Sequence, residues 1–179
     1  MNDSVSERVA VSGASHTRAL AIALLAIGLL ALTLVGNASA STAPDFQAVT
    51  LGGDEVALAD LRGEVVLLNT WATWCTPCKE EMPWLQTLSE RYGAQGLQVV
   101  GVSIDRNGQD DSVRSYADEL GVTFSVWRDP SNQFARAFET TGVPETLLIG
   151  RDGEVLYRWK GALVEDNAAD LALIEDALA

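Results

Sequence analysis

The chain contains 179 residues, of which 47% are hydrophobic and 21% are charged, and this is enough for one folded domain with an additional segment. Its 25 acidic side chains outnumber the 12 basic ones, which gives a formal net charge of −13 at pH 7. This charge argues against binding to nucleic acid, which needs clustered lysine and arginine, and against attraction to an anionic membrane surface.

The N-terminal residues predict a targeting segment. Residues 1–18 form a polar tail, and residues 19–36 form an uncharged apolar stretch near the lower length limit of a membrane-spanning helix. We therefore expect a transmembrane anchor with its N-terminus in the cytoplasm. The acidic residues of the tail do not oppose this orientation, because Asp and Glu contribute little to the positive-inside rule.

A secreted form is the alternative to the anchor. Ala38-Ser39-Ala40 has the small-residue pattern of a signal-peptide cleavage site, so the chain could instead be cut after Ala40. The apolar stretch is longer than the roughly 7–15 residues usual in a signal peptide, which favours the anchor. In both cases a linker at 37–43 leads to a domain at 44–179, which is expected in the periplasm or otherwise outside the cytoplasmic membrane.

Hydrophobic periodicity and turn residues predict alternating strands and helices in this domain. Strands are expected at 46–51, 55–58, 65–70, 97–104, 123–127, 146–149 and 154–159, and helices at 75–92, 111–120, 131–138 and 165–178. Asp111 and Ser131 are expected to cap the second and third helices. The first two strands form an N-terminal hairpin around Gly52-Gly53. This order predicts an α/β fold with a central mixed sheet and helices on both faces.

The chain has only two cysteines, Cys75 and Cys78, which stand where a buried strand meets a helix. A Cys-x-x-Cys pair in this context indicates a redox-active dithiol. The thiolate is the reactive species, and the unpaired N–H groups at the start of a helix favour it. We expect Cys75 to be the exposed attacking sulfur and Cys78 to be the sulfur that resolves the mixed disulfide.

Other interpretations use the same two cysteines. A purely structural disulfide is disfavoured, because so short a loop gives little entropic stabilisation. Zinc is disfavoured because two thiols are half of a tetrahedral set, and the only histidine, His16, precedes the domain. We thus expect no metal, and no cofactor besides the Cys75–Cys78 disulfide. A Cu(I)-handling thiol module and a peroxiredoxin-like antioxidant enzyme stay open as alternatives.

Two motifs carry a resemblance to a known family. The stretch WATWCTPCKEEMP at 71–83 resembles the active site of the TlpA/ResA/CcmG group of extracytoplasmic thioredoxin-like proteins, and TGVPET at 141–146 matches their second signature. The resemblance covers about 44–178 and is greatest to the CcmG form. It implies a thioredoxin-like fold with an inserted β/α segment at about 105–138, and a thiol-disulfide oxidoreductase that reduces disulfides.

The same resemblance implies the partners. The substrate is a disulfide-containing protein such as an apocytochrome c during cytochrome c maturation, and a membrane electron carrier of the CcdA/DsbD type re-reduces the enzyme. The sequence itself leaves open the reduction potential, the direction of exchange, the physiological substrate and the oligomeric state.

The resemblance also implies roles for residues beyond the cysteines. Pro144 corresponds to the cis-proline beside the cysteine pair. Glu81 shares a helix stripe with apolar residues and should face the dithiol, and Glu145, next to the proline, is expected near the same cleft. We predict that both carboxylates tune the thiols and carry protons. The residues expected to contact substrate flank these groups: Trp74, Thr76, Pro77 and Val143.

Overall fold

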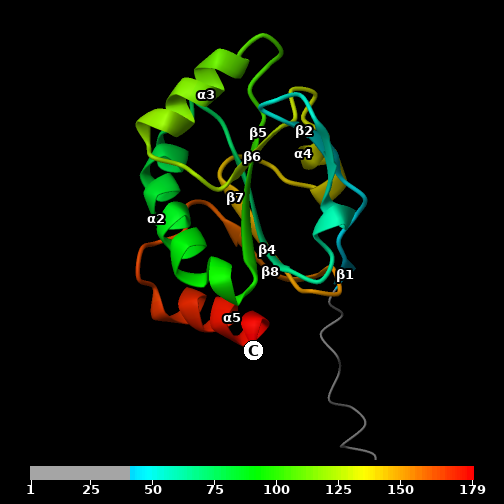
Figure 1. The fold of residues 1–179 in the computed structure, drawn as a ribbon, viewed down its shortest axis with the longest axis vertical. Coiled ribbons are helices and arrows are strands. Elements are labelled where there is room, and N and C mark those ends of the chain that lie inside the picture. The colour runs from blue at the N-terminus through cyan, green and yellow to red at the C-terminus, as the bar shows by residue number, and fades with distance from the viewer. Residues whose placement is uncertain (1–40) are drawn as a thin grey trace, which may run out of the picture. The chain divides into compact units, whose positions relative to one another are not determined.

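Strand β4 (Val65–Trp71) is buried over its whole length and lies inside an eight-stranded sheet. The computed structural model describes residues 41–179, and the strands of their sheet follow the order β1-β8-β7-β4-β5-β6-β2-β3 (Figure 1). β4 pairs in parallel with β5 (Leu97–Ser103) and antiparallel with β7 (Glu145–Ile149). The prediction of a mixed sheet is therefore confirmed.

The remaining elements follow the predicted order. The other strands are β1 (Ser41–Thr42), β2 (Gln47–Thr50), β3 (Glu55–Ala57), β6 (Ser125–Arg128) and β8 (Glu154–Lys160). The helices are α2 (Thr76–Tyr92), α3 (Asp110–Glu119), α4 (Gln133–Phe138) and α5 (Ala168–Leu178), with 3-10 turns η1 (Leu58–Leu61) and η2 (Gly93–Gln95). The β2–β3 hairpin forms as predicted, and the segment at 105–138 contributes α3, β6 and α4.

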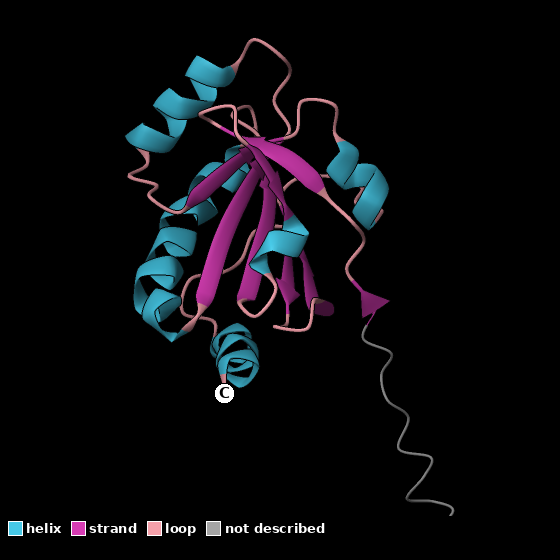
Figure 2. Cartoon of the chain, turned by 45° about the vertical axis from the view of Figure 1, so that its right-hand side comes forward, coloured by secondary structure: helices cyan, strands magenta, loops and turns pink. Residues whose placement is uncertain are grey.

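Helices cover both faces of the sheet, as the two ribbon views show (Figures 1 and 2). Helices α2, α3 and α5 pack against one face, whereas α4 and η1 pack against the other. Side chains of β4 pack into both hydrophobic cores: Leu67 lies on the α2 side of the sheet and Leu68 on the α4 side. Successive side chains of a strand point to opposite faces, so a strand covered on both faces needs an unbroken apolar run.

The two predicted helix caps are wrong. Asp111 lies inside the first turn of α3, whose N-cap residue is Gln109 without a side-chain capping bond. In α4 the cap is Asn132, whose side chain accepts a hydrogen bond from the backbone N–H of Ala135 at 3.3 Å. The Ser131 hydroxyl instead donates to the carboxylate of Asp129 at 3.3 Å.

Strand β1 was not predicted. Ser41 and Thr42 pair with Val155 and Glu154 of β8, although this part of the chain was expected to be a linker. Two exposed polar residues give no hydrophobic periodicity, so the pairing leaves no signal in the sequence.

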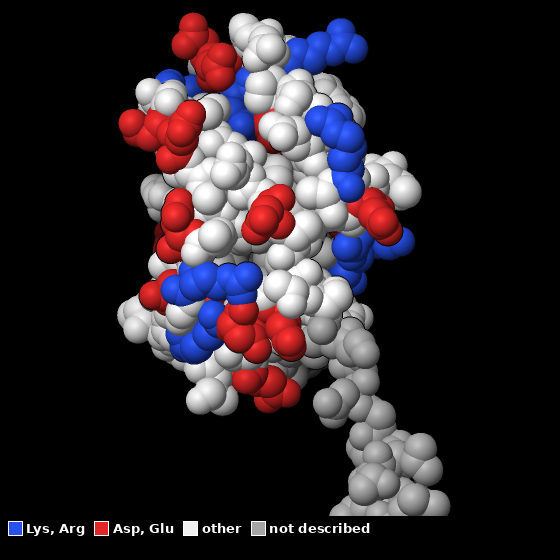
Figure 3. Space-filling model, turned by 90° about the vertical axis from the view of Figure 1, so that its right-hand side faces the viewer, with Lys and Arg blue, Asp and Glu red and all other residues white. Residues whose placement is uncertain are grey.

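The predicted tail at 1–18, the apolar stretch at 19–36 and the cleavage site at Ala40 lie outside the described residues. Within 41–179, none of the helices has the length and apolar character needed to span a bilayer. On the face shown in Figure 3, acidic and basic side chains alternate and do not gather into one basic area.

Candidate active site

The two cysteines lie at the first turn of α2, directly after the loop that follows β4. Cys75 is the N-cap residue, and it forms a disulfide with Cys78 across a Cα–Cα distance of 5.3 Å. The backbone N–H of Cys78 also donates to the Cys75 sulfur at 3.2 Å. Pro77 is tolerated in this turn because the N–H that it lacks would have no helical partner. The sequence thus places one sulfur at the positive end of a helix.

Exposure distinguishes the two sulfurs less sharply than expected. Cys75 is 5% exposed and Cys78 is fully buried. Cys75 is therefore the more exposed of the two cysteines, as predicted, but it is itself buried. The neighbouring Trp74 is 65% exposed, and Thr76 and Pro77 are exposed as well. The disulfide therefore lies just under the surface, with its predicted contact residues around it.

The peptide bond between Val143 and Pro144 is cis, as the resemblance implied. Val143 packs against the hydrophobic cluster that contains both cysteines. Together with Trp74, Val143 lines a groove of about 320 Å³ whose walls also include Thr70 and Ile104. The loop before β7 and the loop before α2 thus meet at one concave surface, although about 70 residues separate them in the sequence.

Glu81 lies one turn beyond Cys78 and faces inward, as predicted. It is 2% exposed, and its carboxylate accepts hydrogen bonds from the Asn69 side-chain amide at 2.8 Å and from the backbone N–H of Leu163 at 2.9 Å. Burial raises the pKa of Glu81 from 4.5 to about 7, and these two hydrogen bonds oppose the rise. A carboxyl group below the cysteine pair can therefore gain or lose a proton near neutral pH.

Glu145 does not share this environment. In the β4–β7 pairing Glu145 lies opposite Thr70, whereas Thr146 lies opposite Asn69, and the Thr146 hydroxyl accepts from the Asn69 amide at 2.9 Å. Neighbouring residues of a strand point to opposite faces, so Glu145 is directed away from the Glu81 side of the sheet. Its carboxylate accepts from Arg158 at 2.7 Å in a largely buried ion pair. Thr70, the cross-strand partner of Glu145, lines the groove beside Trp74 and Val143, so the expectation that Glu145 lies near the cleft stays a prediction.

Several polar residues of the site were missed in the sequence. Asn69 donates to Glu81 from the sheet and to the Thr146 hydroxyl, and Asp105 holds the loop before Cys75 through Thr73. A signal was available for Asn69, because it is a polar residue within an otherwise apolar buried strand. Asp105 gave only the weaker signal of a polar residue that directly follows a buried strand.

Among residues 41–179, no three His, Cys, Asp or Glu side chains lie close enough together to hold a metal ion.

Comparison with known proteins places this arrangement in a family. Residues 40–158 match the AhpC/TSA family. The thiol-disulfide oxidoreductase ResA of Geobacillus kaustophilus is 35% identical over 157 residues, which cover 85% of this chain and 89% of that protein. ResA of Bacillus subtilis is 32% identical over 130 residues, covering 73% of this chain and 72% of that protein.

Solved structures agree with these relatives. A Chlorobium tepidum protein assigned as the thiol:disulfide interchange protein DsbE superposes with a TM-score of 0.71 at 34% identity, covering 78% of this chain and 97% of that one. A Neisseria meningitidis protein assigned as a thioredoxin gives a TM-score of 0.66 at 34% identity, covering 76% and 90%. The domain has the thioredoxin-like fold that the resemblance implied. The chain therefore belongs to the AhpC/TSA family, and with its disulfide-forming Cys75 and Cys78 it is a thiol-disulfide oxidoreductase of the ResA/DsbE type.

Proposed function

We propose that this oxidoreductase works as a reductase of protein disulfides outside the cytoplasmic membrane. The observation that carries the proposal is the placement of the cysteine pair beside a groove, above a carboxyl group whose pKa is about 7. Residues 19–36 are the proposed anchor, and 44–179 the catalytic domain. Cleavage after Ala40 would give the same domain in a secreted form.

The proposed reaction begins with the dithiol form. The Cys75 thiolate attacks one sulfur of the substrate disulfide, which forms a mixed disulfide and releases the other substrate sulfur as a thiolate. The Cys78 thiolate then attacks the Cys75 sulfur, which forms the Cys75–Cys78 disulfide and releases the second substrate thiolate. Two electrons pass to the substrate. A membrane carrier of the CcdA/DsbD type is the proposed donor that returns the disulfide to the dithiol.

Glu81 is the proposed proton carrier of this cycle. The resolving sulfur, Cys78, is fully buried, so water has little access to the proton that it must lose. A carboxylate one helical turn away can accept that proton, and a pKa of about 7 matches it to operation near neutral pH. We assign this step to Glu81 and not to Glu145, which faces the other side of the sheet from Glu81 and is paired with Arg158.

The groove is the proposed site for the chain around the substrate disulfide. Its walls combine the apolar side chains of Trp74, Ile104 and Val143 with the hydroxyls of Thr70 and Thr141. A surface with these groups suits an extended peptide without a strong charge requirement. Thr76 and Pro77, which follow Cys75 in the sequence, are exposed and are proposed to contact the same substrate. An apocytochrome c, whose haem-binding cysteines must be reduced before haem attachment, is the proposed substrate.

Trapping of the mixed disulfide tests the proposal. In a Cys78→Ala variant the second step is blocked, so the enzyme should accumulate as a Cys75-linked adduct with an oxidised apocytochrome peptide. A Cys75→Ala variant is the matched control and should give no adduct. The wild-type dithiol should release the peptide in its reduced form. Adducts through Cys78, or tight Cu(I) retention by the dithiol without disulfide reduction, would contradict the proposal.

A further inference from the structure

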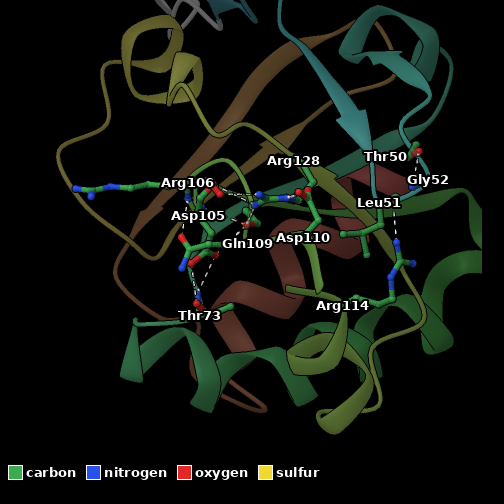
Figure 4. A network of polar contacts seen from close by, with 11 residues as sticks. Thr50, Leu51, Gly52, Thr73, Asp105, Arg106, Gln109, Asp110, Arg114 and Arg128 are labelled. Carbon is green, nitrogen blue, oxygen red and sulfur yellow. Dashed lines mark hydrogen bonds and ion pairs between the residues drawn. The ribbon is translucent and has the colours of Figure 1, made fainter. Parts of the chain in front are cut away.

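A buried carboxylate holds the loop that carries the attacking cysteine. Asp105 follows β5 and is fully buried. One of its oxygens accepts a hydrogen bond from the backbone N–H of Thr73 at 3.0 Å, and the other accepts from the Thr73 hydroxyl at 2.7 Å (Figure 4). Thr73 stands two residues before Cys75, so both bonds act directly on the loop between β4 and α2.

These bonds continue the sheet beyond the point where β4 stops pairing with β5. The last backbone bond between the two segments joins the N–H of Ile104 to the carbonyl of Trp71 at 3.0 Å. The chain then turns towards α2. The backbone N–H of Thr73, two residues after Trp71, donates to the Asp105 side chain. A side chain thus takes the place of a backbone acceptor and sets where the loop leaves the sheet.

Asp105 is itself fixed by a buried arginine. Arg128, at the end of β6, is 2% exposed, and it donates to the Ser103 hydroxyl at 2.7 Å. That hydroxyl donates in turn to the Asp105 carboxylate at 2.9 Å. The guanidinium also donates to the backbone carbonyls of Asp105 and Arg106, at 3.2 and 3.1 Å (Figure 4). Burying a carboxylate without hydrogen-bond donors would destabilise the fold. The donors around Asp105 offset this loss and fix the orientation of its side chain.

We propose that Asp105 is a positioning residue for Cys75. It deepens the function proposed above, because it presumes that Cys75 is the attacking cysteine. In the dithiol state no covalent bond joins Cys75 to Cys78, so the loop depends on non-covalent contacts. The Asp105–Thr73 bonds keep Cys75 at the N-cap of α2, where the first N–H groups of the helix stabilise its thiolate.

Thr73→Val and Thr73→Ser separate this role from general stability. Valine keeps the shape of threonine but loses the hydroxyl, whereas serine keeps the hydroxyl. The full-length reduced protein is alkylated with iodoacetamide over a range of pH, and the modification of Cys75 is followed by mass spectrometry. We expect Thr73→Val to react about three- to tenfold more slowly at pH 7, with its profile moved to higher pH. Thr73→Ser should match the wild type.

Asp129→Asn is the matched control. Asp129 is also buried, but it accepts from the N–H of Phe134 at the start of α4, so its replacement should lower stability and leave the alkylation profile unchanged. A Thr73→Val profile identical to the wild type would overturn the inference, as would an equal slowing in Thr73→Ser. If iodoacetamide modifies Cys78 before Cys75 in the wild type, the proposed function fails with it, and this outcome is recognised without the variants.

Discussion

Burial gives Glu81 a protonation equilibrium near neutral pH, and its partners explain why the side chain remains inside. The Asn69 amide and the Leu163 N–H bind one oxygen each, so the ionised form is not left without donors. Desolvation nevertheless outweighs these bonds and raises the pKa to about 7. Glu81 therefore binds and releases its proton near neutral pH.

This equilibrium predicts a pH dependence of stability. Because the pKa of Glu81 is higher in the folded state than the ordinary value of 4.5, folding favours the protonated form. The resulting stabilisation is complete below pH 4.5 and is lost as the pH rises through 7. The wild type should lose about 3 kcal/mol of unfolding free energy through this group across that interval.

Urea denaturation of the oxidised protein at several pH values measures this loss. The Glu81→Gln variant has no titrating group at this position. Its unfolding free energy should therefore change by about 3 kcal/mol less between pH 4.5 and pH 8 than that of the wild type. Glu80→Gln is the control, because Glu80 is the exposed neighbour on the same helix and should leave the slope unchanged. Equal slopes in the wild type and Glu81→Gln would show that the pKa of Glu81 is not raised.

At the scale of the elements, three helices, α2, α4 and α5, each begin at a residue whose side chain caps the helix. In α2 the N-cap acceptor is the Cys75 sulfur, so the reactive group is also part of the helix end. In α5 the Asn167 side chain accepts from the N–H groups of Ala169 and Asp170. In α4 the cap is Asn132, in a left-handed conformation that asparagine adopts more readily than most residues.

The caps of α4 can be tested by two neighbouring substitutions. Asn132→Ala removes the capping oxygen and places alanine at a φ of 52°, so it should lower the unfolding free energy by about 1–2 kcal/mol. Ser131→Ala removes only an exposed side chain that bonds to Asp129, and its effect should stay below about 0.5 kcal/mol. Urea denaturation of both variants measures the difference. A larger loss from Ser131→Ala would show that serine is the cap after all.

At the scale of the whole molecule, the sequence was sufficient for the architecture but not for the polar contacts. The strands at 65–70 and 97–104 were recognisable because burial on both faces demands continuous apolar runs. The disulfide and the cis-proline followed from two short motifs. In contrast, the side of the sheet that Glu145 faces depends on the pairing register of β7, and the role of Asp105 depends on Thr73 and Arg128, which lie 32 and 23 residues away. Contacts of this kind arise only when distant segments meet.

We propose that the domain donates electrons to protein disulfides, and the equilibrium of its cysteine pair with glutathione measures the direction of that transfer. Purified protein is equilibrated with defined ratios of reduced and oxidised glutathione, and the Cys75–Cys78 disulfide is quantified after acid quenching. A reductase should have a potential below about −220 mV, in the range of thioredoxin at about −270 mV. A potential near about −120 mV, typical of a strong disulfide oxidant, would contradict the claim.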